Sequence, residues 1–98
     1  MRTLFSNEHV TLTLEQSIET GLWMVHLNMT TWSHQMYKQY LVQWMHILQQ
    51  LHSEGIQELY SCLPADGKAQ KLIRMFGFKK LAVVDGKIIQ RIETCVNR

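Results

Sequence analysis

The feature that most constrains this chain is the amphipathic segment that begins at Ser33. Apolar residues recur there at three- and four-residue spacing, which places them on one wide face of a helix of about twenty residues. Ser33 or Thr31 can cap its start by accepting a backbone N–H bond, and Gly55 can adopt the left-handed conformation that ends it. The apolar face consists of Met36, Tyr37, Tyr40, Leu41, Trp44, Ile47, Leu48 and Leu51.

Strand patterns precede this helix. Residues 10–14 alternate apolar and polar side chains, and residues 22–29 are rich in strand-forming residues. The segment between them, residues 15–21, is short and polar, so we expect an antiparallel hairpin. In the second strand, one face carries Trp23, Val25, Leu27 and Met29.

After the long helix, residues 56–63 are apolar enough for a buried strand. The following turn places Asp66 as the cap of a second, shorter helix, which Gly77 terminates. Because a helix connects residues 22–29 to residues 56–63, these two strands are predicted to be parallel, with a right-handed connection.

The chain closes with a predicted hairpin. Residues 80–84 and 88–96 flank the dipeptide Asp85-Gly86, which is a strong signal for a tight turn. The predicted order is β-β-α-β-α-β-β, an α/β (α+β) arrangement that we assign to one domain over residues 1–98. A length of 98 residues leaves room for one core.

Composition narrows the functional classes. The chain is 46% apolar and 18% charged, which is typical of a folded globule, and its net charge is +2. Basic residues are scattered, with Lys79-Lys80 the densest point, so we expect no nucleic-acid partner. No window reaches the ~20 apolar residues of a membrane span, and the first residues do not resemble a signal peptide. We therefore predict no membrane contact and a cytoplasmic location.

The element order from Leu22 to Gln90 resembles that of the GNAT-type N-acetyltransferases. The most similar piece is the strand Leu59–Pro64 with its turn to Asp66, followed by the helix end Met75-Phe76-Gly77-Phe78-Lys79. The resemblance implies a GNAT-like mixed sheet, truncated at the N-terminus because the family's first helices have no counterpart before Val10. Residues Trp23–Leu27 further resemble short phage-encoded GNAT-like proteins, some of which are virion or internal head proteins. Such a protein would reside in the host cytoplasm or in the virion.

Two family motifs are missing from this sequence. Active GNAT proteins hold the pyrophosphate of acetyl-CoA in a glycine-containing turn before the long helix, whereas residues 30–36 contain no glycine and place bulky Trp32 there. The family's turn asparagine falls at Asp66 and its tyrosine general acid at Ile73, which cannot donate a proton. We therefore expect a catalytically inert module and no cofactor. Ser33 and His34 remain candidates for weak CoA binding at the helix N-terminus.

Other candidate residues are few. His26 could act as a general base for an amine beside the splayed point of a GNAT-like sheet, although its alternation with Leu22 and Met24 favours a half-buried structural histidine. The five histidines lack the spacing of a metal motif, so no metal site is predicted. Cys62 and Cys95 lie in segments that resemble strands and are expected to pack as small buried apolar residues.

The excess of apolar residues on the long helix predicts a protein partner or self-association. The residues expected at this interface are Trp32, Tyr37, Val42 and Met45. Three hypotheses follow. The first is an inert GNAT-like module that binds protein, in a virion or on a host target. The second is a divergent acetyl-CoA-dependent N-acetyltransferase, and the third is a subunit whose missing N-terminal helices come from a partner.

Overall fold

The computed structural model describes residues 1–30, 34–64 and 67–95. This part of the chain has six strands and two helices, and the predicted hairpins, helices and buried strand are confirmed. One strand at the start had not been predicted. In chain order the elements are β1 (Arg2–Ser6), β2 (Val10–Gln16), β3 (Trp23–Met29), α1 (His34–Ser53), β4 (Glu58–Pro64), α2 (Lys68–Met75), β5 (Lys79–Val84) and β6 (Lys87–Glu93).

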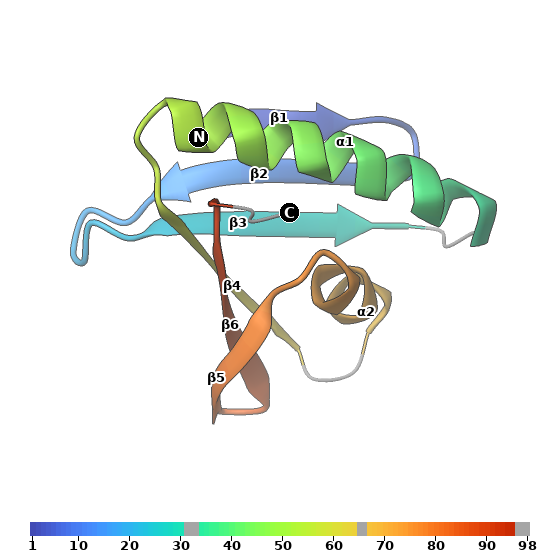
Figure 1. Ribbon diagram of the computed structural model, residues 1–98. Coiled ribbons are helices and arrows are strands. Elements are labelled where there is room, and N and C mark those ends of the chain that lie inside the picture. Colours follow the sequence, from blue (N-terminus) through green and yellow to red (C-terminus); the bar gives the residue numbers. More distant parts are fainter. Residues whose placement is uncertain (31–33, 65–66, 96–98) are drawn as a thin grey trace.

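The strands form one mixed sheet in the order β1-β2-β3-β4-β6-β5. All neighbours are antiparallel except β3 and β4, whose predicted parallel pairing is confirmed. These two strands pair at Met24 and Tyr60. Figure 1 shows β4, β6 and β5 crossing the direction of β1–β3 steeply, so that β3 and β4 splay apart.

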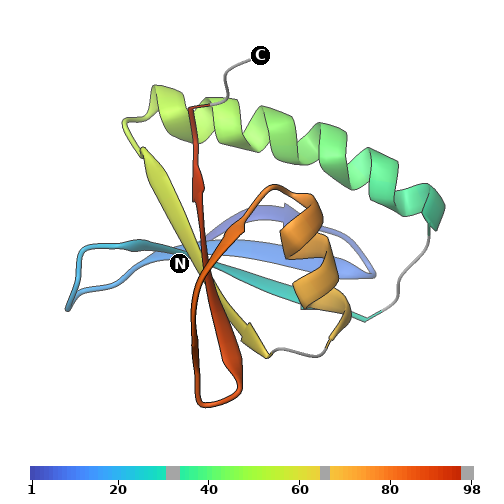
Figure 2. The same cartoon turned by 60° about the horizontal axis from the view of Figure 1, so that its bottom comes forward.

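Both helices pack on the same face of the sheet. α1 lies along β1–β3, and α2 lies in the angle between β3 and the β5–β6 hairpin (Figures 1 and 2). Trp44 joins the two helices because its ring stacks on Phe76 with centroids 4.7 Å apart and its Nε1 donates to the Phe76 carbonyl at 3.0 Å. The core includes Leu12, Leu14, Val25, Leu27, Tyr40, Trp44, Leu48, Leu59, Leu72 and Ile73.

The turns follow from local sequence. Asp85 and Gly86 have φ values of 53° and 76°, the left-handed conformations that a two-residue hairpin loop requires. At the end of α2, Gly77 has φ 105° and its N–H donates to the Arg74 carbonyl, so the helix terminates there as predicted. Strand β6 ends at Glu93, short of the predicted residue 96.

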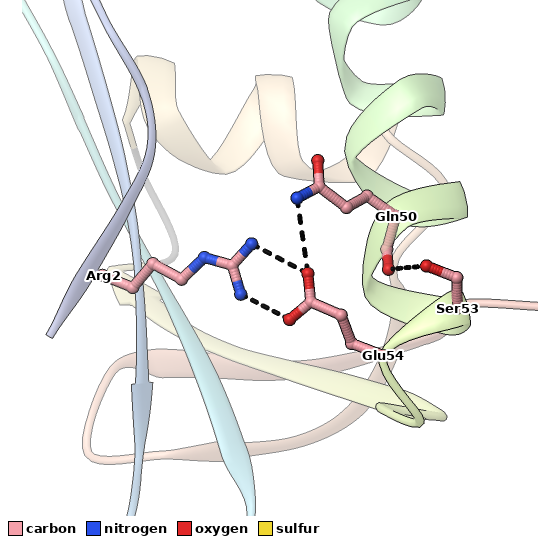
Figure 3. A network of polar contacts seen from close by, with 4 residues as sticks. All are labelled: Arg2, Gln50, Ser53 and Glu54. Carbon is pink, nitrogen blue, oxygen red and sulfur yellow. Dashed lines mark hydrogen bonds and ion pairs between the residues drawn. The ribbon is translucent and has the colours of Figure 1, made fainter.

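Strand β1 is the element that the sequence pattern did not reveal. Asn7 closes its turn to β2, since Asn7 Oδ1 accepts the backbone N–H groups of His9 and Val10 at 2.8 Å. Arg2, the first residue of this strand, forms an ion pair of two hydrogen bonds with Glu54, the residue that follows α1 (Figure 3). The five residues of β1 alternate only weakly between apolar and polar side chains. They form a strand because β2 supplies backbone partners and Glu54 supplies an ion-pair partner.

Candidate functional site

The sheet face opposite the two helices carries a hollow of ≈780 Å³ over strands β2, β3, β4 and β6. No helix of the described part covers this face, since α1 and α2 share their core with the other one. The loop between β2 and β3 forms its rim, where Ile18 is fully exposed and Leu22 is 39% exposed. The residues that line the hollow are Glu15, Gln16, Ser17, Ile18, Glu19, Thr20, Leu22, Met24, His26, Tyr60, Cys62 and Ile89.

His26 lies inside this hollow on β3. Its side chain is 51% exposed, and its Nε2 lies 4.0 Å from Glu15 Oε1 on β2. About half of this side chain is buried, as the sequence predicted, but position 26 points to the face without helices while Val25 and Leu27 fill the core. The other half of the imidazole is open to solvent next to Met24, where β3 meets β4.

Tyr60 faces the same hollow from β4. Its hydroxyl donates a hydrogen bond to Glu58 Oε2 at 2.9 Å. That hydrogen bond, together with burial and the charge of Glu58, raises the pKa of Tyr60 above the usual tyrosine value. The phenol therefore stays protonated at neutral pH and can donate a hydrogen bond but cannot act as a base.

Cys62 also opens onto this face, two residues further along β4. Its thiol is exposed, and so is that of Cys95, which lies beyond the end of β6. The expectation that both cysteines pack as buried residues is wrong. Position 62 alternates with buried Ser61, so strand periodicity directs its thiol to solvent. Among the described residues no three side chains of metal-binding type lie together.

The positions that the sequence resemblance aligned with GNAT catalytic motifs lie elsewhere. Ile73, which that alignment placed at the tyrosine general acid, is fully buried in the core between α2 and the sheet. His34 is the first residue of α1. The predicted turn before α1, with Trp32 and Ser33, and the predicted helix cap Asp66 lie outside the described residues.

The predicted interface residues do not come together as one exposed surface in the described part. Tyr37 packs against the core cluster, and Met45 is half-buried. Val42 is 57% exposed on the outer side of α1. The helix hides most of its apolar excess, because Met36, Leu41 and Ile47 also pack against the core.

Apart from Val42, sequence reasoning missed the apolar residues inside the chain that stay exposed. They lie on the β2–β3 loop, at Ile18 and Leu22, and on strand β5, at Leu81, Val83 and Val84. Every residue of β5 is exposed, since this strand is the edge of the sheet. The alternation in β3 and β4 was the one signal that could have located the hollow, by assigning Met24, His26, Tyr60 and Cys62 to the same face.

Comparison with known proteins supports the architecture. No protein-family model matches the sequence, and no curated protein is similar to it in sequence. A domain from Methanocaldococcus jannaschii DSM 2661 has a similar structure, with a TM-score of 0.63 at 14% identity over 89% of this chain and 57% of that one. This chain thus spans a little over half the length of that domain.

A second similar structure is the ribosomal-protein-S18-alanine N-acetyltransferase from Escherichia coli. Its TM-score is 0.59 at 15% identity, over 96% of this chain and 68% of that one. The six-stranded mixed sheet with its two helices is a GNAT-like fold.

No described helix is long and apolar enough to cross a membrane.

Proposed function

We propose that this chain is a catalytically inert GNAT-like module that binds another protein through the sheet face opposite α1 and α2. The observation that carries the proposal is the ≈780 Å³ hollow on that face. Parallel strand pairs are as a rule covered on both faces, and the parallel pair β3–β4 lies under this hollow with one face bare in the described structure. A partner that covers the hollow would complete the usual two-sided burial.

The chemistry of the hollow indicates what kind of segment it accepts. Its floor and rim offer apolar contacts from Ile18, Leu22 and Met24. Its charged residues are Glu15 and Glu19, and no lysine or arginine lines it. The complement is an amphipathic segment that presents apolar side chains to the floor and a lysine or arginine to the two carboxylates.

Loss of catalysis is supported by the core of the fold. A side chain at position 73 has no access to a substrate, and isoleucine has no proton to donate. The void between α1 and β3, lined in part by Leu27 and Trp44, is only ≈10 Å³, about the space of one water. This void between α1 and the sheet therefore leaves no room for acetyl-CoA. The setting that the sequence resemblance suggests is a phage virion assembly or a host target protein.

Two titrations of the full chain test this function. Acetyl-CoA should not shift the backbone amide signal of His34 at the start of α1, and no amine should be acetylated. A synthetic amphipathic peptide of leucine and lysine should shift the backbone amide signals of Met24, His26 and Cys62, while a leucine–glutamate peptide of equal length should not. Acetyl transfer at ordinary enzyme rates would overturn the inert assignment, and equal responses to both peptides would overturn the acidic docking face.

A matched pair of single-thiol variants locates the partner on the molecule. Cys95→Ser leaves Cys62 on the hollow, and Cys62→Ser leaves Cys95, which is not among the residues that line the hollow. With a thiol-linked photocross-linker, the Cys62 protein should couple to a partner and the Cys95 protein should not. The additional change Glu15→Lys should abolish the coupling through Cys62. Coupling that persists in Glu15→Lys would contradict docking by charge complementarity.

A second candidate function is N-acetyl transfer with His26 as the base. The observation that favours it is the exposed imidazole beside Met24, at the point where β3 and β4 separate. The neighbouring Glu15 carboxylate could stabilise the imidazolium that forms when His26 accepts a proton from an amine. This function requires that His26→Asn abolish acetylation while acetyl-CoA affinity stays unchanged. If Ser33→Pro with His34→Glu left that affinity intact, cofactor placement at the start of α1 would be wrong.

A further inference from the structure

On the helix side of the sheet, a second hollow opens between α2 and the β5–β6 hairpin. It has a volume of ≈400 Å³, within the range of small-ligand sites. Arg74 of α2 and Lys80 of β5 contribute two cations to its wall, and no acidic residue lines it. A neighbouring hollow of ≈520 Å³ shares Gln70 and Arg74 with it and adds Lys71. The structure therefore concentrates positive charge that is scattered in the sequence.

Two buried side-chain amides line this cleft without hydrogen-bond partners among the described residues. Gln70 is 5% exposed and Gln90 is 1% exposed. The side-chain oxygen and nitrogen of each make no hydrogen bond with the described residues, and neither does the hydroxyl of Ser61, which pairs with Gln90 across β4 and β6. Buried polar atoms without partners are rare because their desolvation is not compensated. Two such glutamines beside one cationic cleft make this cleft a candidate binding site.

We propose that this cleft binds a small phosphorylated ligand that also carries hydrogen-bond donors and acceptors, as a nucleoside monophosphate does. The phosphate would pair with Arg74 and Lys80, since guanidinium and ammonium groups make charge-assisted bonds to phosphate oxygens. The two orphaned amides need both a donor and an acceptor from the ligand, which a bare phosphate dianion cannot supply. The edge of an adenine base offers one donor and one acceptor, which match the acceptor oxygen and the donor nitrogen of a glutamine amide.

The position of the cleft separates it from the other sites. It lies on the opposite face of the sheet from the hollow around His26, and α2 and β5–β6 form it rather than the start of α1. The two sites therefore share no lining residue.

The test is an NMR titration of the full chain at low ionic strength with AMP, adenosine and inorganic phosphate. AMP should shift the amide signals of Arg74, Lys80 and Gln90, and adenosine or phosphate alone should bind more weakly. Arg74→Gln and Lys80→Gln should each weaken AMP by at least about tenfold, the loss expected for one charge-assisted bond. Lys87→Gln, a cation of the same hairpin outside the cleft, should change nothing.

Gln90→Leu supplies a readout that a merely structural role would not produce. Replacing an unpartnered buried amide with an apolar side chain of similar volume should raise the thermal midpoint while AMP affinity falls. The proposal is overturned if no probe causes shifts at tens of millimolar, if phosphate alone binds as tightly as AMP, or if Lys87→Gln weakens AMP as much as Lys80→Gln. A dimer that Lys80→Gln abolishes would also overturn it, since the cleft would then hold a second copy of the chain.

Discussion

Arg2 and Glu54 form a two-bond ion pair that ties the first strand to the residue after α1. Arg2 Nη1 donates to Glu54 Oε1 at 2.6 Å and Nη2 to Oε2 at 2.9 Å, and Gln50 Nε2 adds a third donor at 3.4 Å (Figure 3). The pair spans 52 positions of the sequence. It joins the edge strand β1 to the helix layer, although both side chains are exposed to solvent.

The ion pair predicts a pH dependence of stability. The hydrogen bond from Arg2 lowers the pKa of Glu54 in the folded protein. A lowered carboxyl pKa contributes stability above the ordinary glutamate pKa and loses it as pH falls through the folded-state pKa. Thermal midpoints should therefore fall between neutral and acidic pH by more in the wild type than in Glu54→Gln. Equal slopes in the two proteins would show that the pair contributes nothing, and high salt should reduce the difference.

The same pair predicts coupling between β1 and α1. Arg2→Ala and Glu54→Ala should each lower the midpoint of thermal unfolding slightly, and the double variant should lose less than the sum of the two. Additive losses would show that the two residues act separately. A control is Arg91→Ala, because Arg91 pairs with Glu58 of β4 and Glu93 of its own strand β6 and should be additive with Glu54→Ala.

We expect substitutions of Trp44 to cause the largest loss of stability among core residues. Trp44→Phe removes the 3.0 Å hydrogen bond to the Phe76 carbonyl and should cost about 1–2 kcal/mol. Trp44→Ala also loses the stacked contact with Phe76 and should cost about 3–5 kcal/mol. Urea unfolding followed by circular dichroism measures both. If Trp44→Phe were neutral, the indole N–H bond would not contribute to stability.

Ile73→Tyr should not create an acetyltransferase. The larger ring would enter a site that is fully buried, and overpacking of this kind costs about 1–3 kcal/mol. The phenol would remain inside the core, away from any substrate. Acetylation assays and urea unfolding should show no activity and reduced stability, with Ile73→Val as a control that costs about 0.5–1.5 kcal/mol. Gain of acetyl transfer would contradict the placement of position 73 away from any substrate.

Both thiols should react in the native protein. Cys62 and Cys95 are exposed, so a disulfide-exchange reagent should titrate two thiols without denaturant. Alkylation of Cys62 should block the lysine-rich peptide from the hollow, whereas alkylation of Cys95 should not. Reaction that requires urea would contradict the exposed placement of these cysteines.

The pattern of apolar residues was enough to predict most elements of this fold. The 3.6-residue period from Met36 to Leu51 predicted α1, and Asp85-Gly86 predicted the last hairpin, because both depend on neighbours a few residues apart. Alternation in β3 predicted that Val25 and Leu27 are buried. These signals are local, so they survive without knowledge of the rest of the chain.

Strand β1, the solvent exposure of His26 and Cys62, and the two hollows depended on tertiary structure. β1 exists because β2 and Glu54 offer partners that are distant in sequence. The acidic hollow gathers side chains from four strands, and the basic cleft joins α2 to the β5–β6 hairpin. The sequence by itself determined which residues are apolar and at what period they recur. Only the tertiary structure decided which sheet face the helices cover, because that choice minimises exposed apolar surface over the whole chain.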